Sequence, residues 1–413
     1  MTICLFIGIP WFHDLSAVVG EVLAVLIIGG VGLVPGFINL LLVISSLLNK
    51  QKYNINTNPL KPITVLIAAY NEEENIYNTL KYLHQQDYQG AVTVWVADNN
   101  STDGTKAEVE RASKDFLKMP INYCFVAEQG KHFALNQALE KVETEYVVTI
   151  DADTLLHQKA LRYLVARIDA YEDVGAVAGA IMAKNSRSNL WTKMQEWDYF
   201  ISMAAIKKMQ GMYQGTLVAQ GAFSIYNTEL VRSFGGWQDC IGEDIVLTWN
   251  FLKVNWKVYY EPLAVAFTEV PEKFVHLVRQ RSRWARGMIE GLRAVKPWQQ
   301  PNLYYKVLTL LDIAIIYIDF AYTFFFIPGV ILALFGNYLI VGIMFFFVLP
   351  MTLATFIILM RLQKIQVFDQ LELKVRRNIG GFILFILFYQ CVMSPTALWG
   401  YAQELTGSKR TWK

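Results

Sequence analysis

The uneven distribution of apolar residues limits what this chain can fold into more than any other property of its sequence. One apolar block runs from about Leu15 to Leu48, and several more lie between about Val307 and Tyr401. A continuous apolar stretch of roughly 20 residues is long enough to cross a bilayer as a helix. The mean hydropathy of +0.30 over 413 residues agrees with this pattern. We therefore expect membrane helices at both ends and an ordinary mixed domain between them.

The predicted division has three parts: a membrane anchor at residues 1–50, a domain at 60–300, and further transmembrane helices at 305–413. The first apolar block is too long for a signal-peptide core, so we expect it to be retained as an anchor. Within the last part, spans are expected at about 307–335, 338–360 and 381–403.

Positive charge predicts how these parts are oriented. Lys50 and Lys52 follow the first block, and lysines and arginines fill the connection from 361 to 378. Such segments tend to stay in the cytoplasm, so we expect a multi-pass protein of the plasma or inner membrane with a cytoplasmic middle domain. The net charge of +2 gives no bulk attraction to nucleic acid, and no nucleic-acid partner is expected. The four cysteines are scattered and indicate neither a zinc site nor a disulfide framework.

The middle domain alternates between short apolar runs and helical stretches. The run Ile63–Ala69 is continuously apolar, as expected for a parallel strand buried on both faces. Similar runs occur at Val92–Ala97, Tyr123–Val126 and Tyr146–Ile150, and residues 73–86 have helical spacing. This pattern predicts an α/β domain whose site lies at the carboxyl ends of the strands. The amphipathic stretch 190–210 is either a helix packed on the sheet or an interfacial helix at the membrane surface.

Two acids follow the last of these strands. Asp151 and Asp153 are two residues apart, and such a pair can hold one divalent cation against a diphosphate. Mg²⁺ or Mn²⁺ suits an oxygen-rich site of this kind, where the ion would neutralise charge on a leaving group. The alternative is that the acids cap the following helix.

Further polar residues follow the other strands. Asp98 is a candidate to accept a hydrogen bond from a uracil N–H group. Ala69 and Tyr70 end the first strand, where a ligand can approach closely, and Glu72 can reach a ribose or base. A helix start with acids in its first turn is the alternative for Glu72. Lys131 could place an ammonium near phosphate, although a solvated lysine is equally compatible with the sequence.

Two more segments have the composition of a sugar-transfer site. Glu243 and Asp244 precede an amphipathic helix, and a carboxylate there can act as general base or simply cap the helix. The stretch Gly221, Ala222 and Phe223 would supply an apolar wall for a sugar. In the pentad Gln280–Trp284, Arg283 suits phosphate and Trp284 suits a sugar ring, whereas a lipid-binding basic helix is the alternative.

Together these motifs resemble the membrane-embedded processive family 2 glycosyltransferases, which include cellulose, chitin and hyaluronan synthases. The likeness extends over roughly residues 60–295, and in particular the chain resembles bacterial poly-β-1,6-N-acetylglucosamine synthases. It implies an α/β nucleotide-sugar-binding domain of the GT-A type, with a mostly parallel sheet, inserted between transmembrane helices. Gly242 departs from the family pattern, which usually has threonine before the Glu-Asp pair.

The resemblance also implies roles and partners. Asp98 and Glu72 would bind uridine, Asp151 and Asp153 the metal and diphosphate, and Asp244 would be the base of an inverting reaction. Gln280 and Arg283 would grip the pyrophosphate while Trp284 stacks on the acceptor. The expected partners are a UDP-sugar, a growing polysaccharide and the lipid bilayer, and the resemblance allows for a small accessory membrane subunit.

Three classes of function remain open from the sequence. The first is a processive synthase that extends and exports a β-linked polymer, with N-acetylglucosamine as the expected sugar and hyaluronan, chitin, glucan or mannan as the other choices. The second is a single-addition glycosyltransferase that acts on a lipid carrier or membrane lipid. The third is a non-enzymatic sensor, against which the intact acids Asp151, Asp153 and Asp244 argue.

Overall fold

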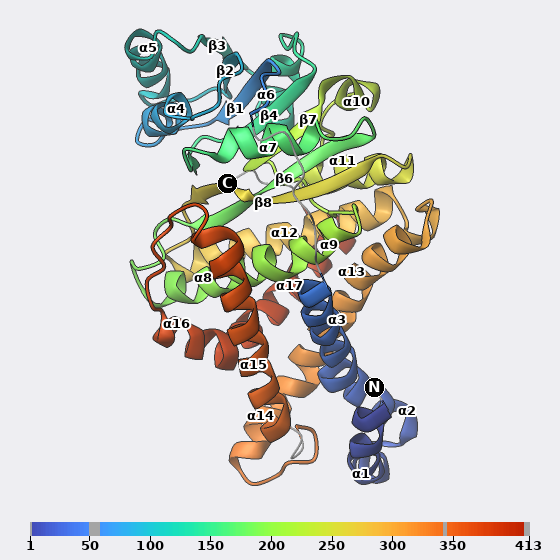
Figure 1. The fold of residues 1–413 in the computed structure, drawn as a ribbon. Helices are drawn as coiled ribbons and strands as arrows, with labels where there is room; N and C mark the ends of the chain where they lie inside the picture. The colour runs from blue at the N-terminus through green and yellow to red at the C-terminus, as the bar shows by residue number, and fades with distance from the viewer. Residues whose placement is uncertain (1, 49–57, 342–344, 409–413) are drawn as a thin grey trace.

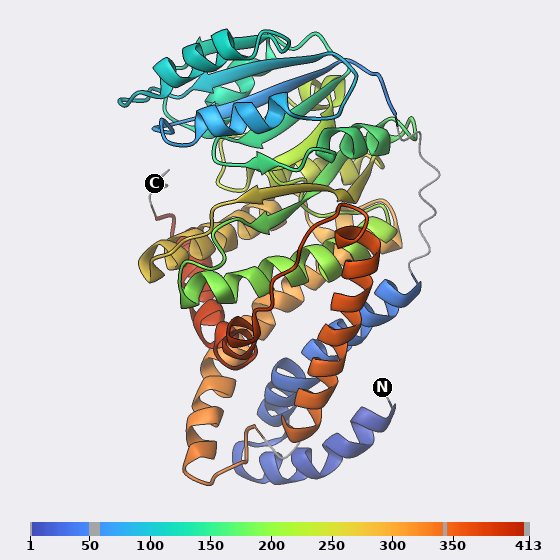
Figure 2. The ribbon, with the colours of Figure 1, turned by 60° about the vertical axis from the view of Figure 1, so that its left-hand side comes forward.

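The computed structural model describes residues 2–48, 58–341 and 345–408 of the chain. Figure 1 shows a sheet domain, a layer of helices beneath it, and a block of long helices that extends away from the sheet. In Figure 2 the middle layer, with α8 (Leu190–Ile201) and α12 (Phe274–Ala294), again separates the sheet from this block. The predicted positive segment at Lys50 and Lys52 lies outside the described residues.

The domain is built on one eight-stranded sheet with the strand order β3-β2-β1-β4-β7-β6-β8-β5. Its strands are β1 (Ile63–Ala69), β2 (Val92–Asp98), β3 (Ile121–Phe125), β4 (Tyr146–Asp151), β5 (Leu155–Leu156), β6 (Val174–Ala183), β7 (Phe223–Asn227) and β8 (Lys257–Thr268). The pairs β1–β2, β1–β4, β2–β3 and β6–β8 are parallel, whereas β7 is antiparallel to both of its neighbours and β5 is antiparallel to β8. The predicted mostly parallel sheet is confirmed. The first four strands agree with the sequence patterns to within two residues at each end.

The first strand shows why the apolar runs become central strands. Ile63, Val65 and Ile67 belong to the core on one face of the sheet, and Leu66 belongs to the core on the other. All four side chains are fully buried. Successive side chains of a strand point to opposite faces, so a strand covered on both sides must be apolar at every position.

Helices cover both faces of the sheet and connect its strands. They are α4 (Ile76–His84), α5 (Thr105–Asp115), α6 (Lys131–Leu139), α7 (Ala160–Ile168), α10 (Thr228–Ser233) and α11 (Glu243–Lys253). The amphipathic stretch 190–210 forms α8, a π-helical turn (Ser202–Lys207) and α9 (Lys208–Met212). Asn189 caps α8 by accepting a hydrogen bond from the Thr192 amide, which explains why this helix begins where it does.

Three helical segments among the described residues are long and apolar enough to cross a membrane: Glu21–Leu48, Leu303–Leu334 and Ile379–Leu405. The first contains α2 (Glu21–Ile28) and α3 (Val34–Leu48), and Gly20 separates it from α1 (Thr2–Val19). The second contains α13 (Leu303–Ala321) and α14 (Ile327–Leu334), and the third α16 (Ile379–Leu384) and α17 (Gln390–Leu405). The last two agree with the spans expected at 307–335 and 381–403. The span expected at 338–360 lies partly outside the described residues, and α15 (Phe345–Gln363) covers the rest.

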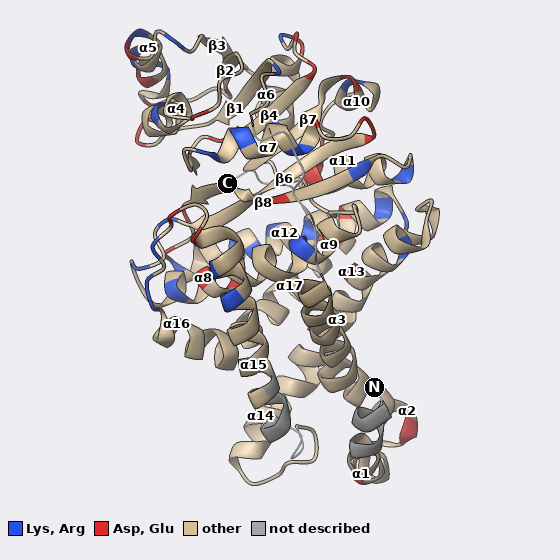
Figure 3. Cartoon of the chain, viewed as in Figure 1, with Lys and Arg blue, Asp and Glu red and all other residues tan. Residues whose placement is uncertain are grey.

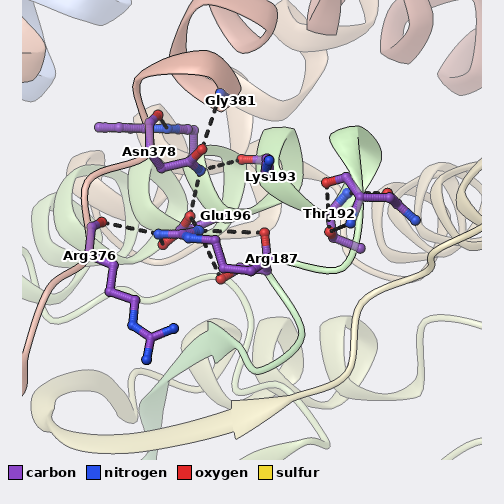
Figure 4. Close-up of polar contacts among 10 residues, drawn as sticks. Arg187, Thr192, Lys193, Glu196, Arg376, Asn378 and Gly381 are labelled. Carbon is purple, nitrogen blue, oxygen red and sulfur yellow. Dashed lines mark hydrogen bonds and ion pairs between the residues drawn. The ribbon is translucent and has the colours of Figure 1, made fainter.

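Charged residues concentrate in the sheet domain and the middle layer, whereas the long helices carry few of them (Figure 3). The basic connection after α15 turns back onto α8 (Figure 4). Arg187 pairs with Glu196 of α8 and donates to the Arg376 carbonyl at 3.1 Å. Asn378 donates to the Glu196 carboxylate at 2.5 Å and to the Lys193 carbonyl at 2.8 Å. These contacts join the connection to the middle layer.

Candidate active site

A cleft of about 690 Å³ opens between the carboxyl ends of the strands and the helix α12. The strand ends, α6 and α11 form one side, while α12 and α17 form the other. Its lining residues are Ala68, Tyr70, Glu72, Lys131, Asp151, Ala152, Asp153, Ile241, Glu243, Arg279, Gln280, Ser282, Arg283, Arg286 and Gln403. The structure therefore brings together eight of the residues that the sequence selected from five separate motifs.

The two acids after β4 lie in this cleft beside a lysine. The Lys131 ammonium is 2.7 Å from Asp151 Oδ1 and 3.9 Å from Glu243 Oε1. Burial alone would lower the pKa of Lys131, but the charges of Asp151 and Glu243 raise it overall, so the side chain stays cationic. Burial and the charges of Asp151 and Glu72 raise the pKa of Asp153 to about 7. Lys131 is thus part of the site rather than a solvated lysine.

These acids fit a divalent cation that is shared with a substrate. Within the described residues, no cluster of three or more His, Cys, Asp or Glu could hold a metal ion alone. Mg²⁺ usually binds one or two carboxylates and takes its other ligands from water and phosphate. Burial first, and then the negative charges of Asp151 and Glu72, raise the pKa of Asp153, and a bound cation would offset both effects.

The residues expected to hold a nucleotide differ in their access to the cleft. Tyr70 and Glu72 line it, and the Glu72 carboxylate accepts a hydrogen bond from Asn75 at 3.0 Å. Ala69 is buried at the end of β1. Asp98 is also buried, at 3% exposure, and its two oxygens accept from the Ser101 amide at 2.9 Å and from the Tyr123 hydroxyl at 2.7 Å. The protein itself therefore holds this carboxylate in a set orientation.

The Glu-Asp pair begins α11, with one acid on the cleft and the other against its wall. Glu243 lines the cleft, and burial together with the neighbouring charge of Asp244 raises the pKa of Glu243 to about 7 despite the opposing charge of Lys131. Asp244 Oδ1 accepts from the Ile245 amide at 2.8 Å, and Oδ2 faces the Gly221 amide at 3.4 Å. Asp244 thus accepts from an amide in the first turn of its helix and contacts the segment that precedes β7.

The segment Gly221–Phe223 contacts Lys131 and Asp151, but the Phe223 side chain does not face the cleft. A Cβ atom at Gly221 would lie 2.7 Å from Lys131 Nζ, so a larger residue there would displace the end of the lysine side chain. The Ala222 carbonyl accepts from the Asp151 amide at 3.3 Å. Phe223, expected to face a sugar, is fully buried in the core. The prediction for Phe223 is wrong because β7 begins at this residue and turns its side chain into the sheet.

The pentad lies on α12 and divides between two faces of that helix. Gln280 and Arg283 face the cleft. Arg281 turns away, pairs with Asp198 of α8 at 2.8 Å, and lies 4.1 Å from the ring centroid of Trp284. Trp284 is 41% exposed and does not line the cleft, so Arg281 covers part of the ring that was expected to stack on a sugar.

Several residues that line the cleft were not predicted from the sequence. Arg279 and Arg286 belong to the same helix face as Arg283, since each lies about one helical turn from it. Extending the helical period beyond the pentad would have found them. Gln403 of α17 reaches the cleft from more than 100 positions away along the chain, where it accepts a hydrogen bond from Ser282 at 3.0 Å. No local signal marks it.

Gly242 joins the two sides of the cleft. A Cβ atom at this position would lie 2.7 Å from the Gly287 backbone, so α11 and α12 approach there through two glycines. Glu290 of α12 accepts from the amides of Ile241 at 2.7 Å and Gly242 at 2.9 Å. This close approach explains why glycine stands where threonine was expected.

We expect Gly242→Ala to destabilise the protein by about 1–3 kcal/mol, because an added methyl group must push α12 away from α11. Thermal unfolding in detergent measures the effect. Gly380→Ala is the matched control, since a Cβ at Gly380 meets nothing within 4 Å. Equal melting temperatures for the two variants would show that the helices can separate without cost.

Comparison with known proteins agrees with the fold and the motifs. Poly-beta-1,6-N-acetyl-D-glucosamine synthase of Staphylococcus aureus (strain COL) is 32% identical over 247 residues, which is 59% of this chain and 58% of the relative. The synthase of Staphylococcus epidermidis is 29% identical over 235 residues, with coverages of 56% and 55%. The chain thus spans less than two thirds of the length of these curated relatives.

A solved structure is similar in fold. The mannosyltransferase from Pyrobaculum calidifontis, in complex with GDP-Man and Mn²⁺, has a TM-score of 0.64 and 19% identity, and the match covers 93% of this chain and 99% of that one. This likeness confirms the expected GT-A type of fold. The profile of the family described as "Glycosyltransferase like family 2" matches residues 59–287. Since that match covers more than half of the chain, the protein belongs to glycosyltransferase family 2.

Proposed function

We propose that this protein is an inverting, processive glycosyltransferase. It transfers N-acetylglucosamine from a UDP-sugar to a growing β-linked polysaccharide and passes the product across the membrane. The observation that carries the proposal is the composition of the cleft, where the acids of the strand ends face the arginines of α12. The names of the staphylococcal relatives support the choice of sugar.

In this proposal the cleft binds the donor by its charge. Tyr70 and Glu72, which line the cleft, would contact the nucleotide, and the buried residues Ala69 and Asp98 would support that end of the site. Gln280 and Arg283 take the pyrophosphate, because a guanidinium donates paired hydrogen bonds to phosphate oxygens. Lys131 adds a fixed positive charge beside Asp151. Asp151 and Asp153 would hold Mg²⁺ or Mn²⁺, which when bound supplies charge neutralisation at the diphosphate.

The transfer itself needs one base. The acceptor hydroxyl oxygen bonds to the anomeric carbon as the bond from that carbon to the UDP oxygen breaks, and the electron pair leaves with UDP. The hydroxyl proton moves to Asp244, whose orientation is set by the amides of Ile245 and Gly221. Attack from the face opposite the leaving group inverts an α-linked donor into a β-linked product. Glu243 precedes this base in the sequence and interacts electrostatically with both Asp244 and Lys131.

The position of the cleft supports a role at the membrane. Ser282, Arg286 and Arg293 of α12 bond to Gln403 and Glu404 near the end of a membrane-span candidate. An acceptor bound near Trp284 would therefore lie close to the long helices through which a polymer could leave. We place the protein in the plasma or inner membrane, as a multi-pass protein with its catalytic domain in the cytoplasm.

The test supplies purified protein in detergent or nanodiscs with a panel of UDP- and GDP-sugars and Mg²⁺ or Mn²⁺. We expect UDP release to be fastest with UDP-N-acetylglucosamine, together with an acid-insoluble product that β-1,6-specific hydrolysis degrades. UDP release with only a solvent-extractable product would instead identify single addition to a lipid. Faster UDP or GDP release with a different nucleotide sugar would show that the proposed sugar is wrong.

A further inference from the structure

Two adjacent lysines in the middle layer are buried and have different surroundings. Lys207 ends the π-helical turn between α8 and α9 and is 9% exposed, and Lys208 begins α9 and is 6% exposed. π-helical turns are rare and occur frequently at functional sites. Lysines are almost never buried without a purpose, because burial of an ammonium is costly.

The Lys207 ammonium points at the segment 218–222, which leads into β7. It donates a hydrogen bond to the Val218 carbonyl at 2.5 Å and another to the Gln220 side-chain oxygen. Gln220 in turn donates to the Gly179 carbonyl at 2.6 Å. Lys207 and Gln220 therefore tie this segment to the turn and to β6.

The same segment contacts Asp244, against the wall of the cleft, and Asp151, which lines the cleft. The Gly221 amide faces Asp244 Oδ2 at 3.4 Å, and the Ala222 carbonyl accepts from the Asp151 amide at 3.3 Å. The Ala219 amide donates to Thr248 Oγ1 at 3.0 Å, and Thr248 donates to the Asp244 carbonyl at 2.6 Å. A shift of this segment would therefore move Asp244 relative to Asp151.

Charge connects Lys207 to the same acid. Burial lowers the pKa of Lys207 to about 7, and the negative charge of Asp244 opposes that shift. When protonated, Lys207 therefore carries a positive charge that interacts electrostatically with Asp244. Lys208 differs, because its ammonium bonds to Gln366 in the connection after α15.

We propose that Lys207 is a positioning residue for glycosyl transfer: it fixes the segment 218–222, which contacts both Asp244 and Asp151. This inference rests on the proposed role of Asp244 as the base. Lys207 does not line the cleft. Its replacement should therefore slow the chemical step without weakening donor binding.

The experiment compares Lys207→Met with Lys208→Met in the full-length protein. We expect Lys207→Met to lower kcat by about 10- to 100-fold, the order of loss that follows a small misplacement of catalytic groups. The KM for the donor, and the affinity for UDP measured by calorimetry, should stay within about threefold of the wild type. Lys208→Met removes an equally buried lysine and should leave kcat within about threefold.

The outcomes separate this inference from the function on which it rests. If the wild type turns over a nucleotide sugar but Lys207→Met retains most of its kcat, the role of Lys207 is refuted and the proposed function stands. An equal loss in both lysine variants also refutes it, because burial rather than position would then explain the effect. If no donor is turned over by the wild type, the proposed function itself fails. Should Lys207→Met not fold, Lys207→Gln is the variant to compare. Its shorter side chain cannot hold both Val218 and Gln220 as the lysine does, so it is expected to lose kcat as well.

Discussion

Asp244→Asn is expected to lower the rate of UDP release by about 10²- to 10⁴-fold, the usual contribution of a positioned general base. The amide has nearly the same shape and can still accept from the Ile245 amide, so the start of α11 should remain intact. It cannot take the proton of the acceptor hydroxyl. Initial rates at saturating donor, with circular dichroism to verify folding, measure the effect.

Asp239→Asn is the matched control for this variant. Asp239 lies shortly before α11, and its side chain is 75% exposed. Its replacement should leave the rate within about twofold. A rate for Asp244→Asn within tenfold of the wild type would show that another group accepts the proton, and Glu243→Gln would then be the variant to compare, because Glu243 is the other acid beside the cleft.

Asp153→Asn is expected to lower turnover by about 10²- to 10³-fold, because charge neutralisation by a metal ion is worth several kcal/mol and each 1.4 kcal/mol is a factor of ten. Removing one of two carboxylates should also weaken Mn²⁺ binding in the presence of UDP. Electron paramagnetic resonance of free Mn²⁺ measures that binding without any need for activity. Asp151 stays in place beside Lys131, so the fold of the strand end is retained.

Two results would contradict this expectation. Unchanged Mn²⁺ affinity in Asp153→Asn would mean that Asp153 is not a ligand. Full activity of the wild type after treatment with a chelator would mean that the arginines of α12 and Lys131 neutralise the diphosphate unaided. Asp169→Asn serves as a control for general effects of acid removal, since Asp169 lies at the end of α7 and its contact with Lys61 is 3.7 Å long and partly exposed.

The core strands could be predicted from the sequence because burial on both faces of a sheet requires a continuous apolar run. β1 begins and ends at the predicted residues, Ile63 and Ala69. β6 and β8 are equally buried, but they were not predicted, since runs rich in alanine such as Ala176–Ala180 do not distinguish strand from helix. The antiparallel direction of β7 could not be predicted from the sequence either, because strand direction depends on the strands beside which β7 packs in the fold.

The site was anticipated where a motif and a strand end coincide. Asp151, Asp153 and Lys131 follow strands or their loops, and the carboxyl ends of parallel strands meet at one edge. Trp284 and Phe223 show the limit of this reasoning. Both are aromatic residues in motifs that suit a sugar, yet Arg281 covers part of the Trp284 ring and Phe223 points into the core.

The sequence alone determined the division into apolar ends and a mixed centre, the central strands, and the acids that end them. These properties depend on local composition and on the period of burial, which a single chain displays directly. Only the tertiary structure decided that Gly242 meets Gly287, that Gln403 completes the cleft, and that Lys207 holds the segment that contacts Asp244. Such contacts join residues that are distant in sequence, and they depend on how α11, α12 and the long helices pack together.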